Sequence, residues 1–203
     1  VERLKNQVAL ITGASSGTGE AISRTLAGQG AAVVLTARRR ERLERIAAEI
    51  EREGGKALAA GMDLTKGEQI DQALQRTMDT FGRLDVLINN AGIGYRAPLV
   101  DMSLENIRAQ IEVNLIGLIE CTRKAIPFIR KQDSGAIINV ASKAGLHPTP
   151  NMAAYGASKW GVRGFTFSLA EELKGDNIRV FNLCPGRVDT GFFDHLPEDD
   201  TYR

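Results

Sequence analysis

Tyr155 and Lys159 are the residues whose types and spacing point most directly to acid–base chemistry. They lie four positions apart in a stretch of helical periodicity, which places their side chains on one face within roughly 6 Å. A phenol with a pKa of about 10 transfers protons poorly near neutral pH, and a nearby ammonium favours the phenolate and lowers that pKa. The pair can therefore protonate a carbonyl oxygen as hydride arrives at carbon, or deprotonate an alcohol. Alone, however, such a pair is more often an ordinary feature of a helix surface.

Two further polar residues stand where they could assist this pair. Ser142 follows an apolar run over residues 136–141. Its hydroxyl would lie at the end of a strand and could hydrogen-bond a substrate oxygen, orienting it rather than attacking it. Asn114 stands in an otherwise apolar stretch, where a buried amide needs hydrogen-bond partners. Each has a simpler explanation, a turn hydroxyl for Ser142 and a solvated helix face for Asn114.

A glycine-rich loop follows the first apolar run of the chain. It consists of Thr12, Gly13, Ala14, Ser15, Ser16, Gly17, Thr18 and Gly19. A loop that enters a helix after a strand directs backbone N–H groups and the positive helix end at a bound phosphate, and glycine lets the ligand approach because no Cβ intervenes. The alternative is a small-residue turn needed only for tight packing. The loop contains no lysine, so it is no P-loop, and a phosphotransferase is disfavoured.

The elements that must position these residues alternate between apolar runs and stretches of helical periodicity, which is typical of a parallel sheet with crossover helices. The predicted strands cover Val8–Thr12, Ala32–Ala37, Ala57–Met62, Leu84–Asn89, Ala136–Ala141 and Ile178–Leu183. Helices are predicted to begin near Gly19, Arg39, Lys66, Ser103 and Ala153. We expect an α/β fold with a doubly wound, Rossmann-like parallel sheet in one domain over residues 1–203. Ligands are then expected beyond the carboxyl ends of the strands.

Composition excludes several classes of function. Twenty-six Lys and Arg against 25 Asp and Glu leave a formal charge of +1, so no global field attracts nucleic acid or an anionic membrane. The most apolar stretch, near residues 111–119, is too short to span a bilayer. Cys121 and Cys184 have no paired spacing and lie near neither histidine, so we expect no disulfide framework and no metal site. These features favour a soluble, cytoplasmic protein.

Five patterns occur here in the order in which short-chain dehydrogenases/reductases carry them. They are the glycine loop, Asn89-Asn90-Ala91-Gly92, Ser142, Tyr155-x3-Lys159, and Pro185-Gly186 followed by Val188 and Thr190. The chain resembles this family over almost its whole length, in its single-domain branch. Thr18 stands where the family more often has an aliphatic residue. The resemblance also leads us to expect a further helix and strand, absent from this sequence, after the final residues 196–203.

The resemblance implies a role for each of these residues. Ser142, Tyr155 and Lys159 would be catalytic, and Asn114 would connect Lys159 through water to a proton relay. Tyr155 and Lys159 would also contact the cofactor, with Lys159 on the nicotinamide ribose. The other residues that would contact the cofactor are Gly13, Ser15, Ser16, Gly17, Thr18, Gly19, Asp63, Leu64, Asn90, Ala91, Gly92, Pro185, Gly186, Val188 and Thr190. For Asp63, a helix N-cap competes with an adenine contact.

The end of the second predicted strand bears on the choice of cofactor. It closes at Ala37 rather than at the acidic residue that would accept from a ribose 2′-hydroxyl, and Arg38, Arg39 and Arg40 follow. Three cations in the first turn of a helix oppose its dipole, and a 2′-phosphate would compensate them. We therefore expect Arg38 and Arg39 to bind NADP(H) in preference to NAD(H), which is the alternative cofactor. A solvated basic helix face is the other explanation of these arginines.

The predicted function is hydride transfer between a nicotinamide cofactor and a small-molecule carbonyl or alcohol, in a homodimer or homotetramer. The alternative is a dinucleotide-binding sensor or scaffold protein without turnover. An epimerase or dehydratase would normally carry a larger sugar-binding region. The sequence does not identify the substrate, which loop residues would select. Suggestive loop residues are Tyr95, Leu146, His147, Met152 and Phe192.

Overall fold

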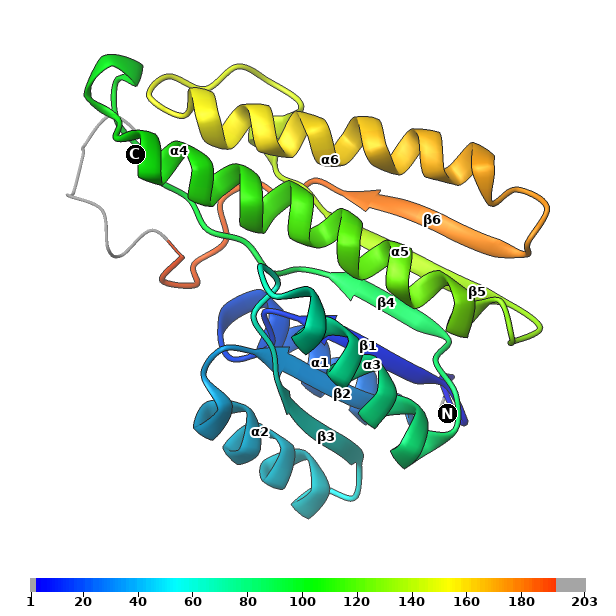
Figure 1. The fold of residues 1–203 in the computed structure, drawn as a ribbon. Coiled ribbons are helices and arrows are strands. Elements are labelled where there is room, and N and C mark those ends of the chain that lie inside the picture. The colour runs from blue at the N-terminus through cyan, green and yellow to red at the C-terminus, as the bar shows by residue number, and fades with distance from the viewer. Residues whose placement is uncertain (1–2, 193–203) are drawn as a thin grey trace.

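Six parallel strands form a single sheet in the computed structural model, which describes residues 3–192 (Figure 1). The strands are β1 (Val8–Thr12), β2 (Ala32–Ala37), β3 (Lys56–Gly61), β4 (Val86–Asn89), β5 (Gly135–Val140) and β6 (Ile178–Leu183). Their order across the sheet is β3-β2-β1-β4-β5-β6, and every neighbouring pair is parallel. The chain winds outward from β1 in one direction and from β4 in the other, so the predicted doubly wound sheet is confirmed.

Helices cover both faces of the sheet, as a central parallel sheet requires. On one face, α1 (Gly17–Gly28) and α2 (Arg40–Arg52) pack against the side chains of Ala9 and Ile11. On the other face, α3 (Gly67–Phe81), α5 (Gly117–Ile129) and α6 (Ala153–Glu172) pack against Val8 and Leu10. Alternate residues of β1 therefore enter two different cores, which explains why the whole strand is apolar up to Thr12.

A long helical run leads from α4 (Leu104–Ile111) through a π-helical turn (Glu112–Ile116) into α5. It begins where the Ser103 hydroxyl accepts a hydrogen bond from Asn106 N at 3.1 Å, which caps the first turn. Short 3-10 turns occupy Leu99–Asp101 and Lys143–Gly145. None of the helices within residues 3–192 is both long and apolar enough to cross a membrane.

The predicted element bounds are close to the observed ones, with small corrections. Strands β1, β2 and β6 and the start of α6 agree residue for residue. Strand β4 is shorter than predicted because it begins at Val86, after Leu84 and Asp85. The other differences are shifts of one or two positions. β3 runs over Lys56–Gly61 and β5 over Gly135–Val140, while α1, α2, α3 and α4 begin at Gly17, Arg40, Gly67 and Leu104. The final residues 196–203, after which a further helix and strand are expected, lie outside the described residues.

Candidate active site

Tyr155 lies in the first turn of α6, with only 6% of its surface exposed. Its hydroxyl shares a hydrogen bond with the side chain of Ser142, which follows β5. Burial raises the pKa of the Tyr155 phenol, and the hydrogen bond to Ser142 partly opposes that rise. The ring packs with Ala144, Met152 and Phe192, and its centroid is 6.3 Å from that of Phe192. Two of the loop residues suggested for substrate selection, Met152 and Phe192, thus border the phenol.

Lys159 lies one turn further along α6 and is almost fully buried. Its Nζ donates to the carbonyl oxygen of Val140 at 2.9 Å and lies 5.8 Å from the Tyr155 ring centroid. Burial lowers the pKa of Lys159 to about 8. The pKa of Tyr155 is thus raised in this structure, whereas the sequence led us to expect a lowered one, because burial of the phenol determines the direction of the net shift.

Asn114 is fully buried within the π-helical turn, so a solvated helix face is excluded for it. Its Oδ1 accepts from Ile93 N at 2.8 Å, and its Nδ2 donates to Ile93 O at 2.8 Å and to Ser158 Oγ at 3.1 Å. A Cβ added at Gly92 would lie 3.2 Å from Asn114 Oδ1 and 3.5 Å from Lys159 Nζ. Asn114 and Lys159 are therefore both close neighbours of the Gly92 backbone.

The glycine loop is shaped by its own backbone and by the segment after β4. Gly13 and Gly17 adopt left-handed φ values of 68° and 55°. A Cβ on Gly19 would overlap the carbonyl oxygen of Gly13, and one on Gly13 would lie 2.7 Å from Ala91 Cα. These positions therefore require glycine for conformation and close packing as well as for any ligand. The tight packing that the sequence offered as the alternative explanation is therefore present, and it leaves phosphate binding by the loop as a prediction.

The segment after β4 is tied to the end of β1. The Thr12 hydroxyl accepts from Asn90 N at 3.0 Å and from Ala91 N at 2.9 Å. The Asn90 side chain donates to Thr12 O at 3.0 Å. Thr12 ends a strand and is not among the predicted site residues. Its hydroxyl-bearing side chain, placed where the strand meets the glycine loop, is a feature of the sequence from which such a contact could have been predicted. The glycine loop and the Asn89-Asn90-Ala91-Gly92 segment consequently form one continuous border of the sheet edge.

Arg39 reaches the glycine loop, whereas the charge of Arg38 acts on Asp63. The Arg39 guanidinium donates to Ser15 Oγ at 3.0 Å and to Ser16 Oγ at 2.8 Å. Arg38 instead acts on the carboxylate of Asp63, whose pKa it helps to lower. Further along α2, Arg40 pairs with Glu44 at 2.7 Å, which supports the solvated-face explanation for that part of the helix. Of the two predicted phosphate ligands, Arg39 is thus the one that the structure brings to the loop.

Asp63 and Leu64 lie after β3. The Asp63 carboxylate accepts from Thr65 N at 2.9 Å and from Thr65 Oγ1 at 2.8 Å. Burial raises the pKa of Asp63, but the two hydrogen bonds from Thr65 and the charges of Arg38 and Lys66 together outweigh it, so the net shift is downward. The alternative of a helix N-cap is wrong, because α3 begins only after Lys66. Leu64 is buried, and its backbone packs closely against Gly117.

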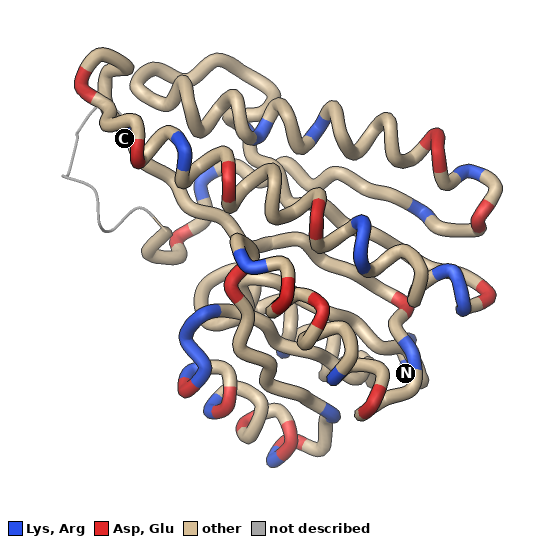
Figure 2. Tube along the Cα trace, viewed as in Figure 1, with Lys and Arg blue, Asp and Glu red and all other residues tan. Residues whose placement is uncertain are grey.

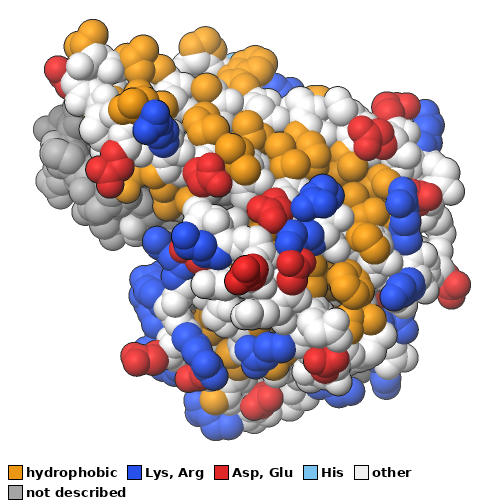
Figure 3. Space-filling view, viewed as in Figure 1, with side chains coloured by type: hydrophobic (Ala, Val, Ile, Leu, Met, Phe, Trp, Pro, Cys, Tyr) orange, Lys and Arg blue, Asp and Glu red, His pale blue; other side chains and the backbone are white. Residues whose placement is uncertain are grey.

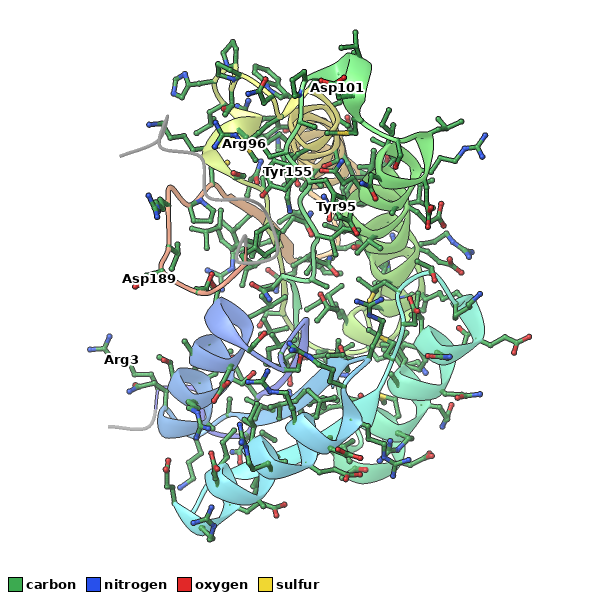
Figure 4. All side chains as sticks on the ribbon, turned by 90° about the vertical axis from the view of Figure 1, so that its left-hand side faces the viewer. Arg3, Tyr95, Arg96, Asp101, Tyr155 and Asp189 are labelled. Atoms are coloured by element: carbon green, nitrogen blue, oxygen red, sulfur yellow. The ribbon has the colours of Figure 1, made fainter. Side chains whose placement is uncertain are left out.

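The segment after β6 approaches the same edge. Lys143 N donates to Pro185 O at 2.8 Å, which joins this segment to the one that contains Ser142. A Cβ added at Gly17 would lie 2.9 Å from Thr190 Cβ, so Thr190 lies against the glycine loop. Gly186 and Val188 are exposed. Three segments that follow β1, β4 and β6 thus meet at the carboxyl edge of the sheet, onto which Figure 4 looks.

This edge fits a dinucleotide. The side chain of Ser16, at the N-cap of α1, makes no capping hydrogen bond and instead accepts from Arg39, so that side chain does not occupy the N–H groups that begin α1. Backbone N–H groups at a helix start and an adjacent guanidinium are the donors that phosphate groups require. The same carboxyl edge of the sheet carries Tyr155, Ser142 and Lys159. Hydride chemistry next to a bound nicotinamide is therefore geometrically feasible.

Comparison with known proteins identifies the family. The family model for short chain dehydrogenase matches residues 7–201. The chain is 40% identical over 196 residues to 3-oxoacyl-[acyl-carrier-protein] reductase FabG of Thermotoga maritima, covering 97% of this chain and 80% of that protein. Over 188 residues it is 38% identical to an uncharacterized oxidoreductase of Staphylococcus epidermidis, covering 93% of this chain and 80% of the relative.

Solved structures give the same assignment. A dehydrogenase/reductase from Sinorhizobium meliloti 1021 superposes with a TM-score of 0.91 at 35% identity, covering 99% of this chain and 79% of that one. A short chain dehydrogenase/reductase from Burkholderia phymatum, solved in complex with NAD, has a TM-score of 0.91 at 30% identity. The match covers 98% of this chain and 73% of that one.

Proposed function

The chain belongs to the short-chain dehydrogenase/reductase family and is an NAD(P)-dependent oxidoreductase, and from this premise we propose that it reduces a carbonyl to a secondary alcohol, or the reverse, through Ser142, Tyr155 and Lys159. The hydrogen bond between the Tyr155 and Ser142 side chains, one helical turn from the buried Lys159 ammonium, carries this proposal. It provides a proton donor and an orienting hydroxyl at one point of the sheet edge.

In the reductive direction, Tyr155 gives its proton to the carbonyl oxygen, and the Ser142 hydroxyl holds that oxygen within reach. The nicotinamide, when bound, supplies the hydride. Lys159 stabilises the phenolate that the transfer leaves, and its hydrogen bond to Val140 O fixes the position of the ammonium group. In the oxidative direction the phenolate takes the proton from the alcohol. Asn114 holds Ile93 beside this site through two hydrogen bonds and is itself tied to Ser158.

The cofactor would be held by residues of several segments. The N–H groups at the start of α1 would bind the pyrophosphate, with Gly13, Gly17, Thr18 and Gly19 allowing its approach. Asp63 and Leu64 would border the adenine, and Asn90, Ala91 and Gly92 would line the middle of the crevice. Pro185, Gly186, Val188 and Thr190 would contact the nicotinamide.

NADP(H) is our preferred cofactor. Figure 2 shows a basic stretch immediately before and at the start of α2. Within it, Arg39 directs its guanidinium at Ser15 and Ser16, so one cation and two hydroxyl groups gather beside the glycine loop. Arginine binds phosphate through parallel charge-assisted hydrogen bonds, and hydroxyl groups add donors. A 2′-phosphate suits this cluster better than the uncharged 2′-hydroxyl of NAD. Arg38, next to Asp63, would contribute through its charge.

A substrate panel tests the reaction. Two relatives at 40% identity are named as 3-oxoacyl-[acyl-carrier-protein] reductases, so a 3-oxoacyl thioester and a simple 3-oxo ester head the panel, followed by aliphatic and aromatic ketones. NADPH oxidation is followed by its absorbance. Turnover of any carbonyl that disappears in Tyr155→Phe supports the proposal. Tight NADPH binding without turnover of any substrate would support the sensor or scaffold alternative instead.

We also propose that two chains associate through the helices that carry exposed apolar residues. Ile116, Trp160 and Phe167 expose 46%, 49% and 57% of their surfaces on the α4–α5 run and on α6. The Arg163 guanidinium lies 5.2 Å from the Trp160 ring and 5.5 Å from that of Phe167. Figure 3 shows hydrophobic side chains gathered over these helices. Large aromatic side chains flanking an arginine are typical of the centre of a protein interface.

A further inference from the structure

The segment of residues 93–97, which follows β4, is held by hydrogen bonds at every second residue. Ile93 exchanges two hydrogen bonds with the Asn114 side chain. Tyr95 N donates to Gln110 Oε1 at 2.9 Å, and Ala97 N donates to Asn151 O at 2.9 Å. This alternation is that of an extended strand, but two of its three partners are side-chain amides rather than a neighbouring strand. The segment therefore depends on individual side chains for its position.

Gln110 is a fully buried side chain that the sequence patterns do not single out. It lies four residues before Asn114, so both amides project from the same face of the α4 run. Besides accepting from Tyr95 N, its amide donates to Asn106 O at 3.2 Å and to Met102 Sδ at 3.6 Å. Both ends of the amide are thus used. An apolar residue of equal size would leave the Tyr95 N–H without this acceptor.

The position of this segment determines one side of the proposed catalytic site. It begins next to Gly92, whose Cα faces Lys159 and Asn114. It ends at Ala97, whose N–H donates a hydrogen bond to the carbonyl oxygen of Asn151, four residues before Tyr155. Figure 4 shows Tyr95 and Arg96 on the same part of the carboxyl edge as Tyr155. Residues 95–97 therefore border one side of the space that a substrate with its carbonyl at Tyr155 would enter.

We propose that Gln110 is a positioning residue that determines substrate binding: through its hydrogen bond to Tyr95 N it holds residues 95–97 at a set distance from Tyr155. This inference rests on the proposed function for its effect on substrate, although not for its effect on the backbone. Asn114 holds the start of the segment, next to the cofactor-side residues Asn90, Ala91 and Gly92. Loss of Gln110 should therefore loosen the substrate side while the cofactor side keeps its contacts.

The first test is Gln110→Met, which keeps the length of the side chain and removes the acceptor. We expect KM for the carbonyl substrate to rise roughly tenfold, the effect of one lost hydrogen bond, while kcat changes less and the Kd of NADPH is unchanged. Amide hydrogen exchange of peptides that cover residues 93–97 should accelerate. Gln132→Met is the matched control, because Gln132 donates to Phe128 O at the far end of α5.

The second test is Gln110→Glu, measured across pH. A neutral carboxylic acid can accept from Tyr95 N and donate to Asn106 O, whereas the carboxylate can only accept. Burial favours the neutral form. At low pH, KM and the hydrogen exchange of residues 93–97 should therefore match those of the unmodified protein, because the neutral acid replaces both contacts of the amide. At higher pH the carboxylate still accepts from Tyr95 N, so exchange should stay slower than in Gln110→Met. A residue that merely fills space would give the same exchange in both variants.

The results separate cleanly. Unchanged hydrogen exchange at residues 93–97 in Gln110→Met would overturn the positioning role. So would a loss of NADPH affinity as large as the rise in KM. If Gln110→Met does not fold, accelerated exchange at residues 93–97 in Gln110→Glu, which keeps the acceptor for Tyr95 N, would overturn it. If no carbonyl is turned over by the unmodified protein, the proposed function fails, and hydrogen exchange still decides whether Gln110 holds the segment.

Discussion

At the scale of single residues, the proposed mechanism assigns to the phenol of Tyr155 a proton transfer that no neighbouring side chain can replace. Tyr155→Phe removes one oxygen from a ring that packs against Met152 and Phe192, so the fold should be preserved. We expect turnover to fall by about 10²- to 10⁴-fold, the usual contribution of a positioned acid. Fluorescence titration should give a nearly unchanged NADPH affinity. Substantial activity in a clean preparation of the variant would refute the assignment.

Lys159 gives the stability of the protein a specific pH dependence. Burial lowers its pKa from 10.5 to about 8, so between these values the unfolded chain binds a proton that the folded chain has lost. The cost of burying the charged form is fully present below pH 8 and diminishes as the pH rises towards 10.5. From pH 7 to pH 10, the unfolding free energy should gain on the order of 2 kcal/mol relative to Lys159→Met.

Urea unfolding of both proteins at pH 7, 8, 9 and 10 measures this difference. The variant removes the ammonium and keeps a side chain of similar length, so groups elsewhere cancel in the comparison. Parallel curves for the two proteins would show that Lys159 stays protonated throughout this range.

For cofactor choice, Arg39 should matter more than Arg38. Arg39→Ala removes the guanidinium beside Ser15 and Ser16, so kcat/KM for NADPH should fall by roughly ten- to a hundredfold, with little change for NADH. Arg38→Ala is the matched control and should have a smaller effect. Steady-state assays with both cofactors make the comparison. An unmodified enzyme that favours NADH would contradict the preference for NADP(H).

The contrast between these two arginines shows which contacts residue spacing can predict and which it cannot. Tyr155 and Lys159 share a helix face because four residues make about one turn, and this needs no knowledge of the fold. Which of two adjacent arginines faces a loop depends on a rotation of the chain between β2 and α2, which the sequence does not specify. Gln110 is not predictable in this way, because its partner, the Tyr95 N–H, belongs to the backbone and leaves no pattern in the side chains.

At the scale of elements, the glycine loop allows a comparison within one helix. Gly19→Ala would place a methyl group on the Gly13 carbonyl, so we expect lost cofactor binding and a lower Tm. Gly28→Ala, at the other end of α1, meets no atom within 4 Å and should raise stability by up to about 1 kcal/mol. Thermal unfolding and NADPH titration of both variants test this. Equal behaviour of the two would mean that the loop tolerates a Cβ.

The strands are predictable because apolar runs between turn residues are a strong pattern for buried parallel strands. Leu84 is wrongly assigned to β4 because it is apolar and buried, although burial continues beyond the ladder itself. The π-helical turn at residues 112–116 is not predicted, since one extra residue in a single turn barely disturbs a helical period. Its consequence is local but important, because it places Asn114 against Ile93.

At the scale of the whole molecule, association should depend on the apolar residues of α6. Phe167→Glu introduces a charge among Trp160 and Arg163, and we expect it to shift the particle from an oligomer towards the 22.0 kDa chain. Light scattering after size-exclusion chromatography gives the mass. Val100→Glu is the control, because Val100 is 92% exposed and belongs to the turn at Leu99–Asp101 rather than to α6. An unchanged mass for Phe167→Glu would refute this interface.

The two hydrogen bonds between the Thr12 hydroxyl and the segment after β4 have a consequence for how the protein folds. They join Thr12 to residues that lie 78 and 79 positions later in the sequence, whereas β1 can pair with β2 as soon as α1 has formed. Closing so long a loop costs more chain entropy than closing the short one, so we expect β1, β2 and β3 to assemble before β4 arrives. During synthesis on the ribosome, the half that bears the glycine loop would then wait, with one edge of β1 unpaired, for the half that bears Tyr155. Interrupting translation between these halves should leave a chain that associates with others through that edge.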